Sequence, residues 1–246
     1  AEKEEVTFFT SAILNNIRKQ LGIDNEVGLA RISTGSIDMA DEISKIAIKN
    51  KWKYLGHYGY AVTKAAYDHG VYGGTEPTDP TSRSSYQSYE SAGFIPIGYQ
   101  YGYTKITMAE FKEQIVETID LMLHTDNDQH MGHAVALLGF YNMTKGLDNS
   151  NSIYDYVGVS MNPGFYEDRY SGYGYLHIIN VPEYYIDPQI PAYKWVIGAN
   201  NTDAVTRRAA TKMTEQLTNR YENDYVNTLR QNAAKALASQ NAAKAA

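Results

Sequence analysis

Residues 131–140 read MGHAVALLGF, in which a histidine precedes an almost unbroken apolar run. A short apolar run bounded by glycine is typical of a buried strand, so we expect a strand at Ala134–Tyr141. Two later segments, residues 154–161 and 175–181, partly alternate and contain β-branched residues, which also favours strands. Because helical patterns come first and strands then follow closely, the order predicts an α+β sandwich with a mainly antiparallel sheet.

Four segments before residue 125 have apolar residues spaced by three and four positions, which predicts amphipathic helices with capping or stop signals at their ends. They are residues 5–21 ending at Gly22, residues 36–52 with Ser36 as N-cap, residues 61–69 ending at Gly70, and a helix from Met108 with a capping box of Thr107 and Glu110. Between them we expect a long loop at residues 72–92 and an edge strand at residues 94–97, where Pro96 lacks an amide proton. Residues 163–164, Pro-Gly, are expected to form a turn.

The C-terminal part has a different character. Apolar residues recur at helical spacing from Val205 to Leu237, and neither proline nor glycine occurs after Gly198. We therefore expect one long helix over residues 202–246 that projects as a stalk or coiled-coil segment. This divides the chain into a globular domain, residues 1–198, and an Ala-rich helix, residues 199–246. The alternative is a helix that folds back along the domain.

Composition excludes several classes of protein. The chain has 246 residues, 43% hydrophobic and 20% charged, which fits a packed globular protein. The net charge is -6 and no basic block occurs, so we expect no nucleic-acid partner. No apolar run reaches the ~18 residues of a membrane helix, and the acidic start does not resemble a signal peptide. The absence of cysteine excludes disulfides and thiolate metal sites. The 22 tyrosines favour a recognition surface.

Three polar residues lie at the edges of predicted elements: His57, Glu90 and His133. Two imidazoles and a carboxylate can hold a divalent metal or move a proton when folding brings them together. The alternative is that each one caps its own element.

A second histidine- and aspartate-rich segment, residues 124–130, fails the EF-hand pattern and is interpreted as a solvated loop. No Gly-x-Ser-x-Gly motif of a serine hydrolase occurs.

Five short motifs in this order resemble the CAP superfamily (cysteine-rich secretory, antigen 5, pathogenesis-related 1). They are Asn15 to Arg18 in the first helix, Gly56-His57, Glu90, Gly132-His133, and the segment Tyr156-Val157-Gly158-Val159. The resemblance spans roughly residues 8–182. Lacking cysteine and carrying an Ala-rich helix, the chain resembles in particular the CAP-like domains of surface exclusion proteins from Gram-positive lactobacilli and enterococci.

The resemblance implies an α-β-α sandwich with a cleft that holds two histidines and two acidic residues. His57, Glu90 and His133 match three of these positions, and Glu117 is the first choice for the second acid, with Asp120 as the second choice. The resemblance also implies a divalent metal, zinc foremost, held by the two histidines. If the cleft is catalytic, Glu90 and Glu117 are the expected catalytic residues.

The function expected from the resemblance is that of an extracellular binding module on the surface of a Gram-positive bacterium. Its ligand would be a peptide, glycan or lipid of a cell surface or host, and the C-terminal helix would mediate self-association. The alternative is a metal-dependent hydrolase of peptides, glycans or lipids that uses the same cleft. Such an enzyme needs an open metal position and a general base near the bound water.

Overall fold

The computed structural model describes residues 2–54, 56–71, 76–83, 90–96, 106–124, 131–141, 154–186 and 225–245. In these ranges the strands are β1 (Ala30–Ile32), β2 (Glu90–Pro96), β3 (Asp155–Tyr166) and β4 (Arg169–Pro182). The helices are α1 (Glu2–Gln20), α2 (Asp24–Val27), α3 (Thr34–Lys49), α4 (Gly59–Asp68), α5 (Met108–His124), α6 (Gly132–Leu137), the 3-10 helix η3 (Glu183–Tyr185) and α8 (Tyr225–Ala245). Most of the loop predicted at residues 72–92 lies outside the described residues.

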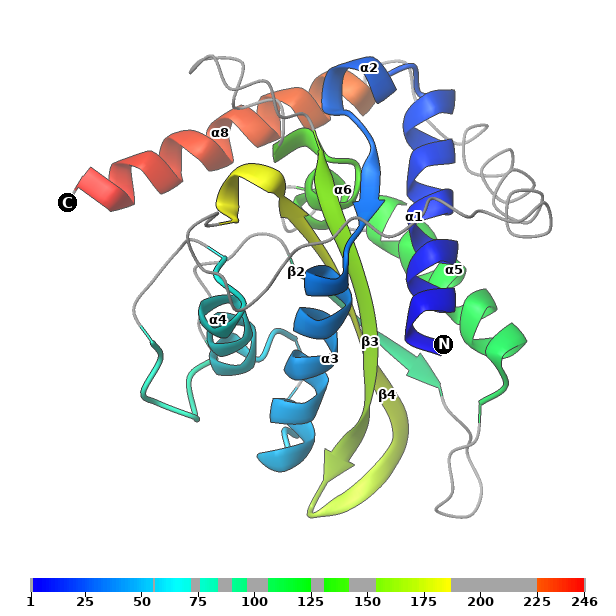
Figure 1. Ribbon diagram of the computed structural model, residues 1–246, viewed down its shortest axis with the longest axis vertical. Helices are drawn as coiled ribbons and strands as arrows, with labels where there is room; N and C mark the ends of the chain where they lie inside the picture. Colours follow the sequence, from blue (N-terminus) through cyan, green and yellow to red (C-terminus); the bar gives the residue numbers. More distant parts are fainter. Residues whose placement is uncertain are drawn as a thin grey trace.

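The four strands form one sheet in the order β1-β3-β4-β2 (Figure 1). β4 pairs antiparallel with both β3 and β2, whereas β1 pairs parallel with the first residues of β3. The predicted α+β class is thus confirmed, and the sheet is mixed, with two antiparallel pairings and one parallel pairing. The edge strand predicted at residues 94–97 begins four residues earlier, at Glu90, and does lie at an edge of the sheet.

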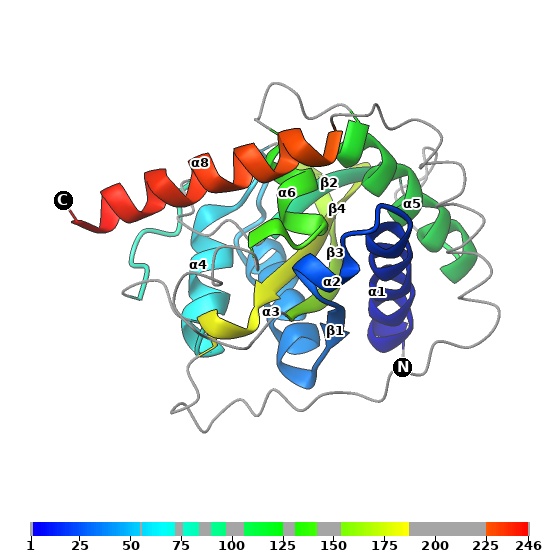
Figure 2. The same ribbon diagram turned by 90° about the horizontal axis from the view of Figure 1, so that it is seen from above.

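Helices cover both faces of the sheet (Figure 2). Alternate strand residues such as Val159 and Ile178 join a core with α1, α5 and α6, while Ile179 and Val181 join a second core with α3 and α4. Because successive side chains of a strand point to opposite faces, the register assigns each strand residue to one of these two layers. The helix α3 approaches β3 so closely that a Cβ atom on Gly158 would lie 2.0 Å from the carbonyl oxygen of Ser36.

The predicted strand at Ala134–Tyr141 is wrong, because the structure has helix α6 at Gly132–Leu137. All four residues from Ala134 to Leu137 are buried, and α6 contacts α5, β2 and α8. A helix surrounded on every side has the same unbroken apolar run as a central strand, so periodicity does not separate the two. Gly139, with φ of 77°, follows the end of the helix and lies against the guanidinium of Arg18.

The connection between β3 and β4 also differs from the prediction. Pro163 and Gly164 lie inside β3, where the register with β4 shifts, so they form a bulge rather than a turn. The chain reverses at Glu167 and Asp168, both with positive φ, 47° and 64°. A two-residue turn with both residues in this region matches the right-handed twist of the flanking strands. The hairpin is consequently longer than the alternation of residues 154–161 and 175–181 indicates.

Most helix boundary signals are present as predicted. Gly22 and Gly70 have positive φ after α1 and α4, and the amide of Glu110 donates to Oγ1 of Thr107 in the capping box of α5. The N-cap of α3 is Ser33 instead of Ser36, because Ser36 occupies the third helical position of the Ser33 capping box.

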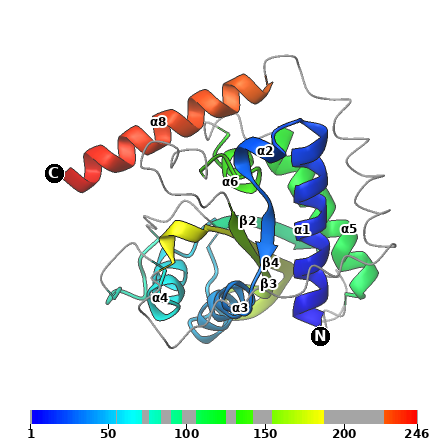
Figure 3. The same cartoon turned by 45° about the horizontal axis from the view of Figure 1, so that its top comes forward.

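The described part of the C-terminal helix, α8, packs on the body beside α6 (Figure 3). Leu229 and Ala233 are buried in the core that contains α1 and α5, and Arg230 forms an ion pair with Glu26 at 2.6 Å. Its first turns therefore belong to the globular body, as in the alternative of a helix that folds back. Residues 202–224 and the proposed boundary at residue 198 lie outside the described residues. None of the described helices is long and apolar enough to cross a membrane.

Candidate functional site

The structure brings His57, Glu90 and His133 together from three distant segments. Glu90 is the first residue of β2, His57 precedes α4, and His133 is in the first turn of α6. The Nδ1 atom of His57 lies 2.6 Å from Oε2 of Glu90. The ring centroids of His57 and His133 are 5.9 Å apart, with an interplanar angle of 33°.

The carboxylate of Glu90 is buried and holds hydrogen bonds on both oxygens. Its Oε1 atom lies 2.6 Å from Nδ1 of His177, while Oε2 faces His57. Burial alone raises the pKa of Glu90, but the hydrogen bonds and the attraction of His177 and His57 outweigh it and lower the pKa to about 2. Glu90 is therefore a carboxylate at neutral pH.

His177 and its neighbour Asn162 were not predicted as site residues. The Nε2 atom of His177 lies 2.6 Å from Oδ1 of Asn162, and both side chains are buried. His177 pairs with Ala92 in the sheet, two residues along the strands from the pair of Glu90 and Ile179, so Glu90 and His177 share a face. A signal existed in the sequence: His177 interrupts the apolar side of the strand predicted at residues 175–181. The partner on β2, however, depends on a register that the sequence does not reveal.

The structure does not bring the expected second acid to the site. Helix α5 packs on the opposite face of β2, where a Cβ atom on Gly93 would meet Thr118. Glu117 is exposed and accepts a hydrogen bond from Gln114 of the same helix, and Asp120 pairs with His124, at 3.2 Å. Within the described ranges, no group of three or more histidine, aspartate or glutamate residues is arranged to hold a metal ion.

The spacing of the two histidine rings is compatible with a shared metal ion. A carboxylate only accepts, so Nδ1 of His57 carries the proton of its bond to Glu90, and the lone pair of the neutral ring is then on Nε2. Two imidazoles that bind one zinc ion at about 2.0–2.1 Å place their ring centroids about 5–6 Å apart. The observed 5.9 Å agrees with this geometry. With two protein ligands, the remaining positions would fall to water or to a bound ligand.

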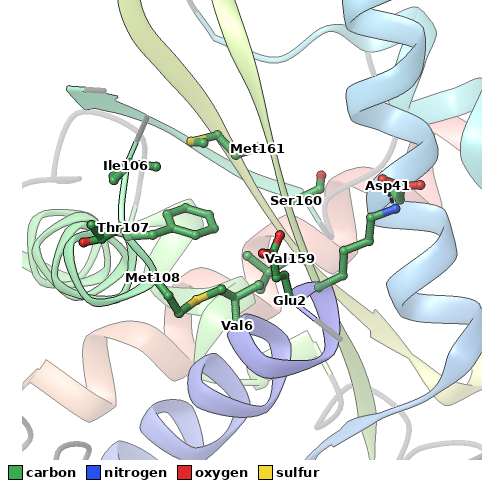
Figure 4. Close-up of a pocket in the computed structure, with 11 residues that line it drawn as sticks. Glu2, Val6, Asp41, Ile106, Thr107, Met108, Val159, Ser160 and Met161 are labelled. Carbon is green, nitrogen blue, oxygen red and sulfur yellow. Dashed lines mark ion pairs between the residues drawn. The ribbon is translucent and has the colours of Figure 1, made fainter. Parts of the chain in front are cut away.

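A separate pocket of about 270 Å³ lies beside β3, between the start of α1, α3 and the start of α5 (Figure 4). Val159, Ser160 and Met161 form one side of it. Its polar rim includes the ion pair of Lys3 with Asp41, at 2.6 Å. Neither the two histidines nor Glu90 lines this pocket, so it is distinct from the candidate site.

Comparison with known proteins shows a likeness in fold to a solved structure. No protein-family model matches the chain, and no curated protein matches it. Among solved structures, it is similar to the CAP domain of enterococcal PrgA, with a TM-score of 0.50 and 23% sequence identity. The match covers 76% of this chain and 64% of that chain. The chain has a CAP fold. The resemblance seen in the sequence motifs is thereby confirmed for the fold, and the α-β-α layers are those of a CAP domain.

The hydrogen bonds of Asn15 and Arg18 give this motif a structural role. Both the carbonyl oxygen and the amide of Ala30 in β1 bond to the side chain of Asn15, at 2.9 and 2.8 Å. Arg18 is fully buried and donates to both oxygens of Asp155 in β3. Asn15 thus attaches α1 to β1, and Arg18 attaches α1 to β3.

Proposed function

We propose that this domain is an extracellular binding module of a Gram-positive surface protein, in which His57 and His133 hold a divalent metal, zinc foremost. The metal would present open coordination positions to a ligand. Supporting this are the CAP fold, its likeness to a domain of an enterococcal protein, and the sequence resemblance to surface exclusion proteins. The absence of cysteine is compatible with an extracellular bacterial protein.

The observation that carries the metal part is the triad of Glu90, His57 and His133. A histidine ligand usually donates its other ring proton to a carboxylate or carbonyl, which fixes the ring and increases its basicity as a ligand. The bond from His57 to Glu90 has this form, and the ring of His133 lies at a distance compatible with a shared ion. Glu90 would orient the ring of His57 and would not itself bind the metal.

The state of Glu90 favours recognition over hydrolysis. A general base works best with a pKa near the operating pH, whereas Glu90 has a pKa of about 2 and both of its oxygens are engaged. Glu117, the other expected catalytic acid, lies on α5 and is exposed. A hydrolase that used this site would have to draw its base from elsewhere in the chain or from the ligand.

Exposed aromatic side chains at the far end of the hairpin from Glu90 would provide a second contact surface for a large ligand. Tyr166, Tyr170 and Tyr173 on the hairpin of β3 and β4 are 66%, 55% and 41% exposed. Tyrosine is enriched at recognition surfaces because its ring offers a large apolar area with a polar end. This supports a peptide or glycan ligand as much as a lipid, and the three remain alternatives within the proposal.

Titration calorimetry with zinc tests the metal proposal. Wild type should bind zinc, and the double variant His57→Ala/His133→Ala should not bind it measurably. His124→Ala is the matched control, since it removes a histidine that pairs with Asp120 away from the site. Equal binding by the wild type and the double variant would end the proposal. Metal-dependent hydrolysis of peptides or glycans, lost in Glu90→Gln with the fold intact, would replace recognition with catalysis.

A further inference from the structure

A chain of hydrogen bonds extends from the candidate site into the sheet. It runs from His57 through Glu90 and His177 to Asn162, with three successive contacts of 2.6 Å. The last three residues are between 0% and 4% exposed. Hydrogen bonds to charged groups in such a dry setting are strong, and each group that loses its partner is costly.

The orientation of Asn162 determines where the protons lie. Its Nδ2 atom donates to the carbonyl of Pro163 at 3.0 Å, so its Oδ1 atom faces Nε2 of His177. An amide oxygen only accepts, and Nε2 of His177 therefore carries a proton. A second proton lies between Nδ1 of His177 and Oε1 of Glu90, because neither atom approaches the other to 2.6 Å without one.

The hydrogen bond between His177 and Glu90 also affects His57, because Glu90 contacts both histidines. With Oε1 of Glu90 held by His177, the orientation of the carboxylate plane is fixed, and Oε2 points at Nδ1 of His57. We infer that His177, held in turn by Asn162, is the positioning residue of the site: it locks Glu90 and thereby fixes His57 in the tautomer with its proton on Nδ1 and its lone pair on Nε2. The use of this tautomer for metal binding rests on the proposed function, but the tautomer itself does not.

The contrasting interpretation is a buried ion pair that only stabilises the sheet. Both interpretations predict a less stable protein when His177 is replaced. They differ for His57: a purely stabilising pair leaves its tautomer unchanged, whereas a positioning residue changes it. The decisive measurement is therefore the protonation of the two ring nitrogens of His57, made without metal.

The experiment is two-dimensional 1H–15N NMR on metal-free protein with 15N-labelled histidine at pH 7. In the wild type, His57 should appear as the Nδ1–H tautomer. His177→Phe should lose this preference and shift toward the Nε2–H form. His177→Asn should largely restore it, since an asparagine amide nitrogen occupies the place of Nδ1. Ser91→Ala is the matched control, because Ser91 is the next residue of β2, is buried and faces away from the site.

The outcomes separate the two proposals. If His177→Phe keeps the wild-type tautomer of His57, the positioning role is refuted. Should that variant fail to fold, Asn162→Leu decides instead: it should shift the tautomer part of the way, and an unchanged tautomer again refutes the role. Zinc calorimetry is the independent arm, in which His177→Phe should bind roughly 10- to 100-fold more weakly than the wild type. A wild type that has the Nδ1–H tautomer but binds no zinc would refute the metal proposal and leave the positioning role standing.

Discussion

Arg18 of α1 and Asp155 of β3 form a two-pronged ion pair, at 2.7 and 2.8 Å, with side chains that are 0% and 1% exposed. Arg18 also donates to the carbonyls of Gly28 and Leu137, and Asn180 of β4 donates to Asp155. One guanidinium thus joins the first helix, the sheet and the end of α6, which carries His133. The bond to Leu137 thus connects this buried pair to the helix that carries His133.

Removing one member of this pair should be severely destabilising. Arg18→Met leaves the Asp155 carboxylate buried without its counter-charge, and we expect a loss of about 3–5 kcal/mol in the free energy of unfolding. Urea denaturation measures the loss. Lys19→Met is the control, since Lys19 is the next residue, is exposed, and should change stability by less than about 0.5 kcal/mol. Similar effects of the two substitutions would show that the pair is unimportant.

Glu90 and Glu117 should differ in their effect on zinc binding. Glu90→Gln weakens the acceptor of the His57 proton, and the loss of a carboxylate that holds a metal-binding histidine typically reduces metal affinity by about 10- to 100-fold. Glu117→Gln, on an exposed face of α5, should leave the affinity unchanged. Calorimetry on the two variants distinguishes them. An equal loss in Glu117→Gln would restore Glu117 as the second acid of the cleft.

Stability should depend on the ionisation of Glu90 in acid. The folded state lowers the pKa of Glu90 from 4.5 to about 2, so the folded protein binds this proton less tightly than the unfolded chain. The resulting stabilisation is fully present above about pH 4.5 and is lost as the pH falls toward 2. The stability difference between the wild type and Glu90→Gln, measured by urea denaturation, should therefore be larger at pH 6 than at pH 3. A difference that is constant or grows toward pH 3 would contradict the pKa direction.

The packing of α8 on the globular body can be tested independently of whether its end mediates self-association. Leu229 is fully buried, so Leu229→Ala should lower the free energy of unfolding by about 2–5 kcal/mol. Gln231→Ala is the control on the exposed side of the same helix. A mild effect of Leu229→Ala would mean that α8 does not pack on the body in solution. Deleting residues 236–246 should leave stability nearly unchanged, and light scattering on that variant tests whether the end of the helix mediates self-association.

Local sequence patterns correctly predict the helices and strands that are specified by residues within the element itself. Helices α1, α3, α4 and α5 follow from apolar spacing and from signals such as Gly22 and the Thr107–Glu110 capping box, which act within one turn. The hairpin strands follow from alternation. The segment at residues 131–140 was misassigned because burial on all sides removes the periodicity that tells a helix from a strand.

The site could be predicted only in part, because its contacts join residues that are far apart in the sequence. His57, Glu90 and His133 were identified from motif order, which reflects the resemblance to a family rather than a contact. The partnership of Glu90 with His177 depends on the pairing of β2 with β4, and nothing near either residue specifies that register. The family resemblance assigns the second acid to Glu117 by its position, whereas the helix of Glu117 covers the other face of β2.

The separation of Glu90 from its partners has a consequence for folding during synthesis. The bond to His57 spans 33 residues, and the bond to His177 spans 87 residues. A chain that emerges from the ribosome N-terminus first has made His57 and Glu90 long before β4 exists. Non-local pairings of this kind form late because the intervening chain must first be ordered. The nascent chain consequently cannot bury Glu90 with both partners until residue 177 has left the ribosome, so the candidate site would form late in the folding of the domain.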